Sequence, residues 1–193
     1  MNTLKLRITF FCCLLLMSFS IAQKCKSSNK MVRQAKKHLS EDKIIKATKF
    51  QRLFSKFSQA GNFNFVKSDK GYYLRIRLIR ELRRRIDIMK NNPLVLQFED
   101  NSFMTLYPNM DFPGKFTLPV TTEINNMFYT VSEEQLEILS KQSVSYVKIY
   151  FTSDKVPDDQ KGVDDLGDFF DYEIKSKRYQ INLQEPAKCM LQS

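Results

Sequence analysis

The sequence predicts an α+β fold that is mostly β, built as an antiparallel sheet or a sandwich-like domain with two or three short helices. Two observations carry this prediction. Several runs of about four to eight residues alternate between apolar and polar side chains, as half-buried strands do. Short turn signals separate most of these runs, and short connections favour hairpins with antiparallel pairing.

The first segments along the chain predict helical or irregular structure. Residues 23–43 are basic and polar, which predicts a leader, either a tail or a weak helix, ahead of the domain. Between Ile44 and Phe57, apolar residues recur at helical spacing and predict a helix; they are Phe50, Leu53, Phe54 and Phe57. The Ala60-Gly61-Asn62 segment that follows predicts a turn.

A β-hairpin is predicted next. Asn62–Val66 alternates, Ser68-Asp69-Lys70-Gly71 is a hairpin turn signal, and Tyr72–Ile79 alternates again. In the second strand the leucines and Ile76 face one way, and Tyr73, Arg75 and Arg77 face the other. The apolar residues from Leu74 to Ile86 also recur every four residues, which fits a helix, but the turn signal before them favours a strand.

A second hairpin is predicted from Leu94–Phe98 and Phe103–Tyr107. Both segments are apolar on both sides, which predicts a central position in the sheet. Further extended segments are predicted over 116–120 and 126–131.

The clearest local signal is Ser132-Glu133-Glu134-Gln135. It is a capping box, and it predicts a short helix from Glu133 to about Lys141 that buries Leu136 and Leu139. Strands are predicted over 144–152 and 169–174, on either side of a Pro/Gly/Asp loop. Pro186 then permits only a short helical turn near the C-terminus.

Residues 1–22 have the three parts of a secretory signal peptide. Lys5 and Arg7 precede a short apolar run from Ile8 to Met17, and Ser20 and Ala22 occupy the small-residue positions before a cut at Gln23. No cysteine follows a small residue at a suitable place for lipidation. The domain organisation predicted is therefore a signal peptide (1–22), a basic leader (23–43) and one β-rich domain (44–193), exported to the periplasm or secreted without a lipid. An uncleaved anchor is the alternative.

Cleavage would remove Cys12 and Cys13 and leave Cys25 and Cys189. Exported domains meet an oxidising environment, so a Cys25–Cys189 disulfide is predicted. Two unrelated thiols are the alternative.

The net charge of +10 conceals two unlike halves. Gln23–Lys90 holds 20 Lys/Arg and 5 Asp/Glu, whereas Asn91–Ser193 holds 9 and 16. Export argues against nucleic acid as the partner and leaves lipid headgroups, lipopolysaccharide phosphates and acidic glycans. The candidate contacts for an anionic partner are Arg75, Arg77, Arg80, Arg83, Arg84 and Arg85. A solvated sheet face is the alternative for these arginines.

No catalytic constellation is recognised, and no metal or cofactor is expected. The single histidine, His38, lies in the basic leader, where it is poorly placed to serve as a catalytic base. One histidine and two distant cysteines do not supply a zinc site. The aspartates of 154–168 do not have EF-hand spacing, so a solvated loop is favoured over a calcium site.

Three segments carry a resemblance to a known group. They are Pro93–Asp100 before a hairpin, Tyr129–Leu136 leading into a helix, and Val147–Thr152, followed by a cysteine near the C-terminus. Together with Ile21-Ala22-Gln23, they resemble a group of small exported proteins of Bacteroidetes. The resemblance covers about the last half of the chain, and it implies a β-rich exported domain without catalytic residues. The 154–168 segment is longer and more acidic than the tight hairpin usual in that group.

Three functions are compatible with these observations. The first is a non-enzymatic exported domain that binds another envelope or secreted protein. The second is a binder of anionic lipid or glycan through the Arg75–Arg85 region. The third is a hydrolase with an unrecognised carboxylate site.

Overall fold

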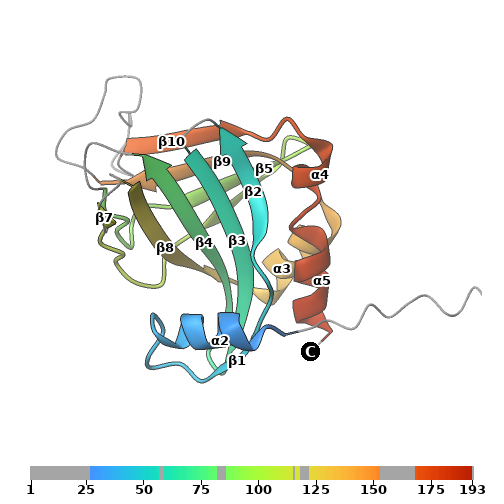
Figure 1. Cartoon of the computed structure of the whole chain (residues 1–193). Coiled ribbons are helices and arrows are strands. Elements are labelled where there is room, and N and C mark those ends of the chain that lie inside the picture. The colour runs from blue at the N-terminus through green and yellow to red at the C-terminus, as the bar shows by residue number, and fades with distance from the viewer. Residues whose placement is uncertain are drawn as a thin grey trace, which may run out of the picture.

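Two antiparallel sheets face each other, with helices at one end and along one side (Figure 1). The structure is a computed structural model, and it describes residues 27–56, 59–81, 86–114, 116–117, 122–152 and 168–192. The mostly β, sandwich-like fold class predicted from the sequence is confirmed.

The first sheet contains six strands in the order β1-β3-β4-β8-β7, with β2 paired to β3. The strands are β1 (Ile44–Ala47), β2 (Gln51–Lys56), β3 (Gln59–Ser68), β4 (Gly71–Glu81), β7 (Phe116–Thr117) and β8 (Thr122–Val131). Phe63, Ile76 and Met127 oppose one another across β3, β4 and β8, and all three are fully buried. Their side of the sheet is the inner face, toward the core.

The second sheet contains four strands in the order β10-β9-β5-β6. They are β5 (Leu94–Phe98), β6 (Phe103–Leu106), β9 (Val144–Phe151) and β10 (Asp168–Glu173). The predicted central position holds for β5 but is wrong for β6, which ends the order. Only Met104 and Leu106 of β6 are buried, whereas Phe103 is 66% exposed. Strand β6 thus has apolar residues on both faces, but only the face with Met104 and Leu106 is buried.

Helix α3 (Glu133–Lys141) confirms the predicted capping box. The Gln135 N–H donates to Ser132 Oγ at 3.1 Å, and the Ser132 N–H donates to Gln135 Oε1 at 2.9 Å. Leu136 and Leu139 are buried as expected. The helix packs against α5 (Gln184–Leu191), which follows the single turn α4 (Lys177–Gln180). Pro186 fits the first turn of α5, where backbone N–H groups have no partner within the helix.

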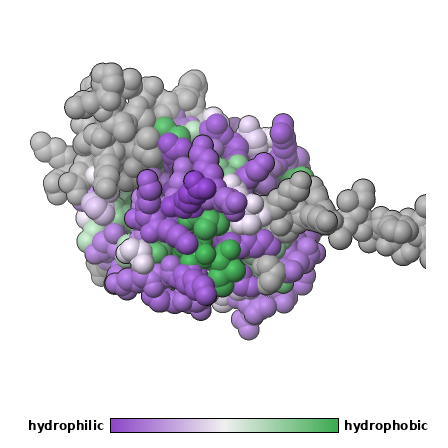
Figure 2. All heavy atoms as spheres, turned by 60° about the horizontal axis from the view of Figure 1, so that its bottom comes forward, coloured by the Kyte–Doolittle hydropathy of each residue, from purple (hydrophilic) through white to green (hydrophobic). Residues whose placement is uncertain are grey.

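The basic leader is packed onto the domain through α2 (Asn29–Lys36), which lies against β1. Met31, Ala35 and Leu39 belong to the hydrophobic core. Figure 2 shows the molecule from this side, where a small apolar patch is surrounded by a mostly hydrophilic surface. None of the helices in the described ranges is long and apolar enough to cross a membrane.

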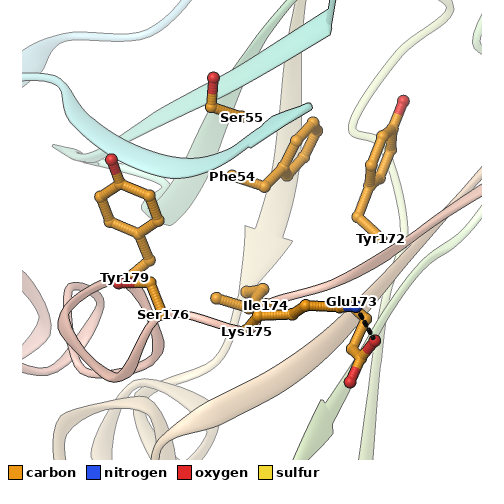
Figure 3. Close-up of a pocket in the computed structure, with 8 residues that line it drawn as sticks. All are labelled: Phe54, Ser55, Tyr172, Glu173, Ile174, Lys175, Ser176 and Tyr179. Atoms are coloured by element: carbon orange, nitrogen blue, oxygen red, sulfur yellow. Dashed lines mark ion pairs between the residues drawn. The ribbon is translucent and has the colours of Figure 1, made fainter. Parts of the chain in front are cut away.

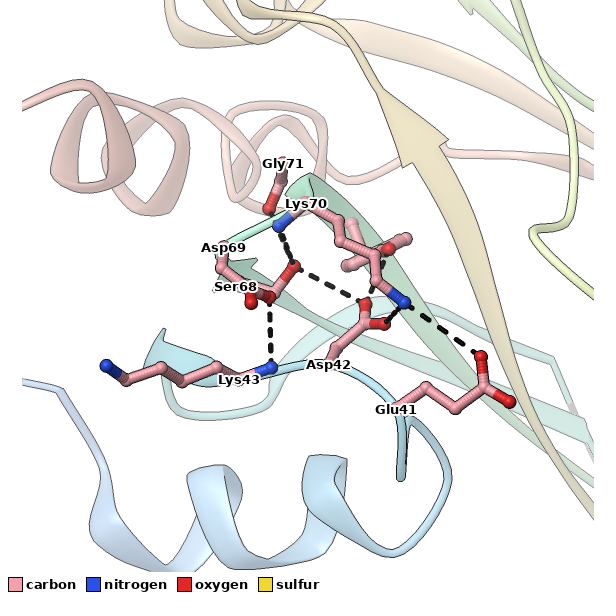
Figure 4. A network of polar contacts seen from close by, with 8 residues as sticks. Glu41, Asp42, Lys43, Ser68, Asp69, Lys70 and Gly71 are labelled. Atoms are coloured by element: carbon pink, nitrogen blue, oxygen red, sulfur yellow. Dashed lines mark hydrogen bonds and ion pairs between the residues drawn. The ribbon is translucent and has the colours of Figure 1, made fainter.

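The loop after α2 is tied to the β3–β4 hairpin by polar contacts (Figure 4). Asp42 accepts hydrogen bonds from the Tyr73 hydroxyl at 2.7 Å and the Ser68 hydroxyl at 3.4 Å, and it pairs with Lys70 at 2.8 Å. The Lys43 N–H donates to Asp69 at 2.9 Å. The hairpin turn itself confirms the prediction, with Gly71 at a φ of 134° that other residues rarely adopt.

The helix predicted between Ile44 and Phe57 is wrong, because this segment forms β1 and β2. A β-bulge explains the misleading spacing. Arg52 pairs with Asn62 and Phe54 pairs with Gly61, so Leu53 is an extra residue without a partner. Leu53 and Phe54 can therefore both be buried, at 0% and 3% exposure, which breaks the alternation of a regular strand.

The turn predicted at Ala60-Gly61-Asn62 is also wrong, because these residues lie within β3. Gly61 has a packing role there. A Cβ on Gly61 would lie 2.3 Å from Cε1 of Phe54, so the absence of a side chain makes room for the Phe54 ring.

Candidate functional site

The outer face of the first sheet brings arginines and asparagines together in two rows. Paired residues on neighbouring strands present their side chains on the same face. The first row is Arg52–Asn62–Arg77–Asn126 across β2, β3, β4 and β8, and the second is Asn64–Arg75–Phe128. We call the six polar residues of these rows the arginine–asparagine face. Its first row is half-buried, and Asn64 and Arg75 of the second row are buried.

Arg75 is the most unusual residue of this face, because it is only 2% exposed. Its Nη2 donates to Oδ1 of Asn126 at 2.8 Å. Its Nε and Nη1 are buried and have no hydrogen-bond partner within the described part of the chain. The guanidinium lies 4.9 Å from the ring centre of Phe50 and 5.3 Å from that of Phe128. Aromatic faces therefore take the place of the usual carboxylate partner.

All the charged residues of the face are arginines, so its charge is positive. Burial, together with the nearby charge of Arg77, lowers the pKa of Arg75 to about 10. Arg75 still carries its charge at neutral pH. Strands β2 and β3 contain no Asp or Glu. Two neighbouring guanidinium groups thus lie together without a compensating carboxylate in either row.

The buried amide of Asn64 fixes the connection between β1 and β2. Its Nδ2 donates to the carbonyl oxygen of Thr48 at 3.1 Å, and the Thr48 hydroxyl accepts from the Phe65 N–H at 2.9 Å. Oδ1 of Asn64 has no partner among the described residues. The connection held in this way carries Phe50, the half-buried ring that lies against Arg75.

The structure divides the six arginines predicted as anionic contacts. Arg77 lies half-buried in the first row, where a ligand could reach it. The sequence analysis listed Arg75 as a candidate contact for an anionic partner, but the structure corrects this, since Arg75 is buried and is not a surface contact. Arg80 belongs to β4, but its side chain is outside the described part of the structure, and Arg83, Arg84 and Arg85 lie outside the described residues.

Arg52 and the three asparagines were missed by the sequence interpretation. They are far apart along the chain, and only the pairing of four strands brings them to one face. A correct assignment of the β2–β3 and β4–β8 registers would have found them.

A pocket of about 430 Å³ lies beside this face, between the last residues of β2 and the segment from β10 to α4 (Figure 3). Tyr172 and Tyr179 stand on opposite sides of it, and Phe54 and Ile174 lie between them. Ser55 and Ser176 also line the pocket.

The remaining sequence candidates do not converge on a site. His38 is exposed, and its ring lies 5.8 Å from that of Phe128 in an ordered segment rather than in a mobile tail. Of the acidic loop 154–168, only Asp168 lies within the described residues. In the part of the chain that the structure describes, no group of three or more His, Cys, Asp or Glu could hold a metal ion.

Cys189 lies in α5. Cys25 lies outside the described residues, so the pairing of these two cysteines remains a prediction.

Comparison with known proteins adds no assignment to this geometry. No protein-family model, no curated protein and no solved structure matches the chain. The resemblance to exported proteins of Bacteroidetes therefore remains a hypothesis.

Proposed function

We propose that this protein is an exported, non-catalytic binding domain that holds an acidic glycan on its arginine–asparagine face. The observation that carries the proposal is the pair Arg75 and Arg77, which share one sheet face with three asparagines and have no carboxylate partner in either row.

The positive charge supports an anionic ligand. Guanidinium N–H groups form strong, charge-assisted hydrogen bonds with carboxylate, sulfate and phosphate oxygens. Arg52 and Arg77 are half-buried, so they are accessible but partly shielded from water. Buried Arg75 adds a fixed charge behind them, and a charge in a low-dielectric setting acts more strongly than one in bulk solvent.

The asparagines support a glycan among the anionic ligands. The first row alternates guanidinium and amide groups, with neighbouring strands about 4.8 Å apart. An amide both donates and accepts hydrogen bonds, which suits sugar hydroxyl groups. A lipid surface would also require apolar side chains to enter the bilayer, and a protein interface is commonly centred on aromatic residues. The first row supplies neither.

The proposal is tested by affinity electrophoresis of the purified protein in gels that contain alginate, a polyuronate. We expect Arg77→Ala to weaken retention by about tenfold or more, because a charge-assisted hydrogen bond contributes about 1.5–3 kcal/mol. Arg33→Ala is the matched control, since it removes the same charge from an exposed position on α2. Retention should fall as salt rises, because the charges are partly accessible to ions.

Three results would overturn this function. The first is an equal loss of retention in Arg33→Ala, which would indicate an effect of net charge alone. The second is equal retention in gels that contain neutral dextran. The third is no alginate retention together with a stoichiometric complex with an envelope protein, which would favour the protein-binding hypothesis.

A further inference from the structure

The end of the molecule formed by α2, the loop after it and β1 is strongly basic. Between Asn29 and Lys46 the sequence has six Lys/Arg residues and two Asp/Glu residues. The basic residues are Lys30, Arg33, Lys36, Lys37, Lys43 and Lys46, and the acidic residues are Glu41 and Asp42. Figure 2 looks onto this end and shows a small apolar patch within a mostly hydrophilic surface. Positive charge and exposed apolar area therefore occur together here.

Helix α2 directs its cations to solvent. Met31 and Ala35, one turn apart, are buried, so the apolar side of the helix already packs into the core. Lys30, Arg33 and Lys36 are exposed on the rest of the helix. None of these three residues forms an ion pair within the described part of the chain. Their charges are therefore available to an external anion.

The two carboxylates that follow α2 do not neutralise these cations. Asp42 pairs with Lys70 of the β3–β4 turn at 2.8 Å and accepts the hydrogen bond from Tyr73. Glu41 lies 4.0 Å from the same Lys70. Both acidic side chains are thus directed to the hairpin, where Lys70 offsets part of their charge (Figure 4).

A β-bulge in β1 exposes an isoleucine beside α2. Ile44 pairs with Ser68 and Lys46 pairs with Lys67, so Ile45 is an extra residue without a partner on β3. Bulges change the direction in which a side chain points. Ile45 is 54% exposed, whereas Ile44 is only 5% exposed. The bulge therefore places an apolar side chain on the surface of an otherwise paired strand.

The first turn of α2 adjoins this strand. The Ser28 N–H donates to the carbonyl oxygen of Ala47 at 2.8 Å, and the Val32 N–H donates to the carbonyl oxygen of Ser28 at 2.9 Å. Val32 is half-buried. Val32 and Ile45 thus supply exposed apolar area on two adjoining elements, among the cations of α2.

Two further lysines add to the positive charge. Lys46 and Lys67 are direct cross-strand partners, and like charges in such a pair destabilise a sheet. Burial, followed by the charge of Lys67, lowers the pKa of Lys46 below its usual value of 10.5. An anionic surface placed against this end would reduce the repulsion between the two lysines.

We infer that this end of the molecule docks on an anionic phospholipid bilayer. Helix α2 lies along the surface, its lysines and Arg33 contact the headgroup phosphates, and Ile45 enters between the headgroups. Basic residues near an anionic membrane and a buried apolar side chain both contribute to such binding. The first row of the arginine–asparagine face supplies charge without an apolar side chain, so the two sites suit different ligands. This inference does not depend on glycan binding.

The test is sedimentation of the purified protein with vesicles of phosphatidylglycerol and phosphatidylcholine in equimolar mixture. We expect Arg33→Ala to weaken vesicle binding about fivefold, because one basic residue near an anionic surface contributes about that factor. Ile45→Ser should also weaken it about fivefold, because half of an isoleucine side chain no longer leaves water. Both residues are exposed, so both variants should fold, and circular dichroism checks this.

Each variant has a matched control on α4 or just after it, at the other end of the molecule (Figure 1). Arg178→Ala removes the same charge from an exposed position, and Ile181→Ser removes an isoleucine that is 50% exposed. Both controls should bind as the wild type does.

Four results would overturn the inference. The first is no binding to the anionic vesicles, and the second is equal binding to vesicles of phosphatidylcholine alone. The third is that Arg33→Ala and Ile45→Ser weaken binding no more than their controls do. The fourth is release of the protein by inorganic phosphate at constant ionic strength, which would indicate a site for the phosphate group and not for a bilayer.

Discussion

At the scale of single residues, Arg75 shows that the environment of a side chain depends on its tertiary contacts. The alternation of β4 places it with Tyr73 and Arg77, on the face expected to meet solvent. In the structure, Phe50 and Phe128 flank its guanidinium, which forms one hydrogen bond, to Asn126, within the described residues. A buried charge that lacks a carboxylate partner opposes folding.

We therefore expect Arg75→Met to stabilise the protein by about 1 kcal/mol, because a buried ionic group replaced by an apolar side chain of similar length often raises stability. This corresponds to a rise in Tm of roughly 2–4 °C for a chain of this size. Thermal unfolding followed by circular dichroism measures the change. A fall in Tm would mean that the aromatic contacts and the bond to Asn126 outweigh the loss of solvation. Alginate retention should weaken in the same variant.

Gly61 is a second residue whose role depends on its neighbours. In the sequence it stands between alanine and asparagine, a typical turn composition. In the structure it is opposite Phe54, and the ring occupies the volume that a side chain would fill. The glycine at this position allows close packing and does not form a turn. The local sequence does not distinguish these two roles.

At the scale of elements, the Asp42 contacts join α2 and its loop to the β3–β4 hairpin. Burial raises the pKa of Asp42, but hydrogen bonds from Lys70 and Tyr73 and the charge of Lys70 outweigh it, and the pKa ends below its usual value of 3.8. Burial, together with the bond to Asp42, raises the pKa of Tyr73 to about 12, so this hydroxyl remains a donor at neutral pH.

The lowered pKa of Asp42 gives a pH dependence of known sign. A carboxylate with a depressed folded pKa contributes stability above its unfolded pKa and loses it as pH falls through the folded value. We expect Asp42→Asn to lower the free energy of unfolding by about 1–3 kcal/mol at pH 7. Below pH 3.8 the wild-type carboxylate becomes protonated, so the free energies of unfolding of the two proteins should become more similar. Urea unfolding at several pH values measures both effects.

Tyr73→Phe is the control for that experiment, because it removes one donor and leaves the Asp42–Lys70 pair intact. Its loss of stability should be smaller than that of Asp42→Asn. A difference between Asp42→Asn and the wild type that does not change with pH would contradict the role of the ionised carboxylate.

The elements also show where local patterns are sufficient. Helix α3 was predictable because its capping box and its buried residues lie within one short segment. Strand β2 was not, because its bulge arises from pairing with β3 and imitates helical spacing. The β3–β4 hairpin was predictable from its turn, whereas the edge position of β6 depended on which strands pair with β5.

At the scale of the whole molecule, one covalent link is expected to join the start of the chain to its end. We expect Cys25 to pair with Cys189. In a loop-entropy estimate, a bond that closes so long a segment stabilises the fold by about 4–5 kcal/mol at most. Reduction should therefore lower Tm. Peptide mapping without a reductant identifies the pair, and recovery of Cys25 as a free thiol would contradict it.

The charged halves of the chain also meet only in the whole molecule. Strands β1 to β4 come from the basic half, and β8, from the acidic half, lies beside β4 in the same sheet. The basic character is nevertheless retained on the outer face, because Asn126 and Phe128 are the β8 residues that oppose Arg77 and Arg75. The positive charge of the basic half is therefore concentrated on the outer face of the first sheet.

The sequence by itself determined the β-rich class, the α3 helix, the β3–β4 hairpin and most strand segments, because each depends on residues close together in the chain. The tertiary structure alone decided that Arg75 is buried, that Arg52 joins Arg77 across Asn62, and that Phe54 meets Tyr172 beside a pocket. These features depend on strand register and on a single bulge. Both depend on which distant segments pack together, and the spacing of residues within one segment does not predict that.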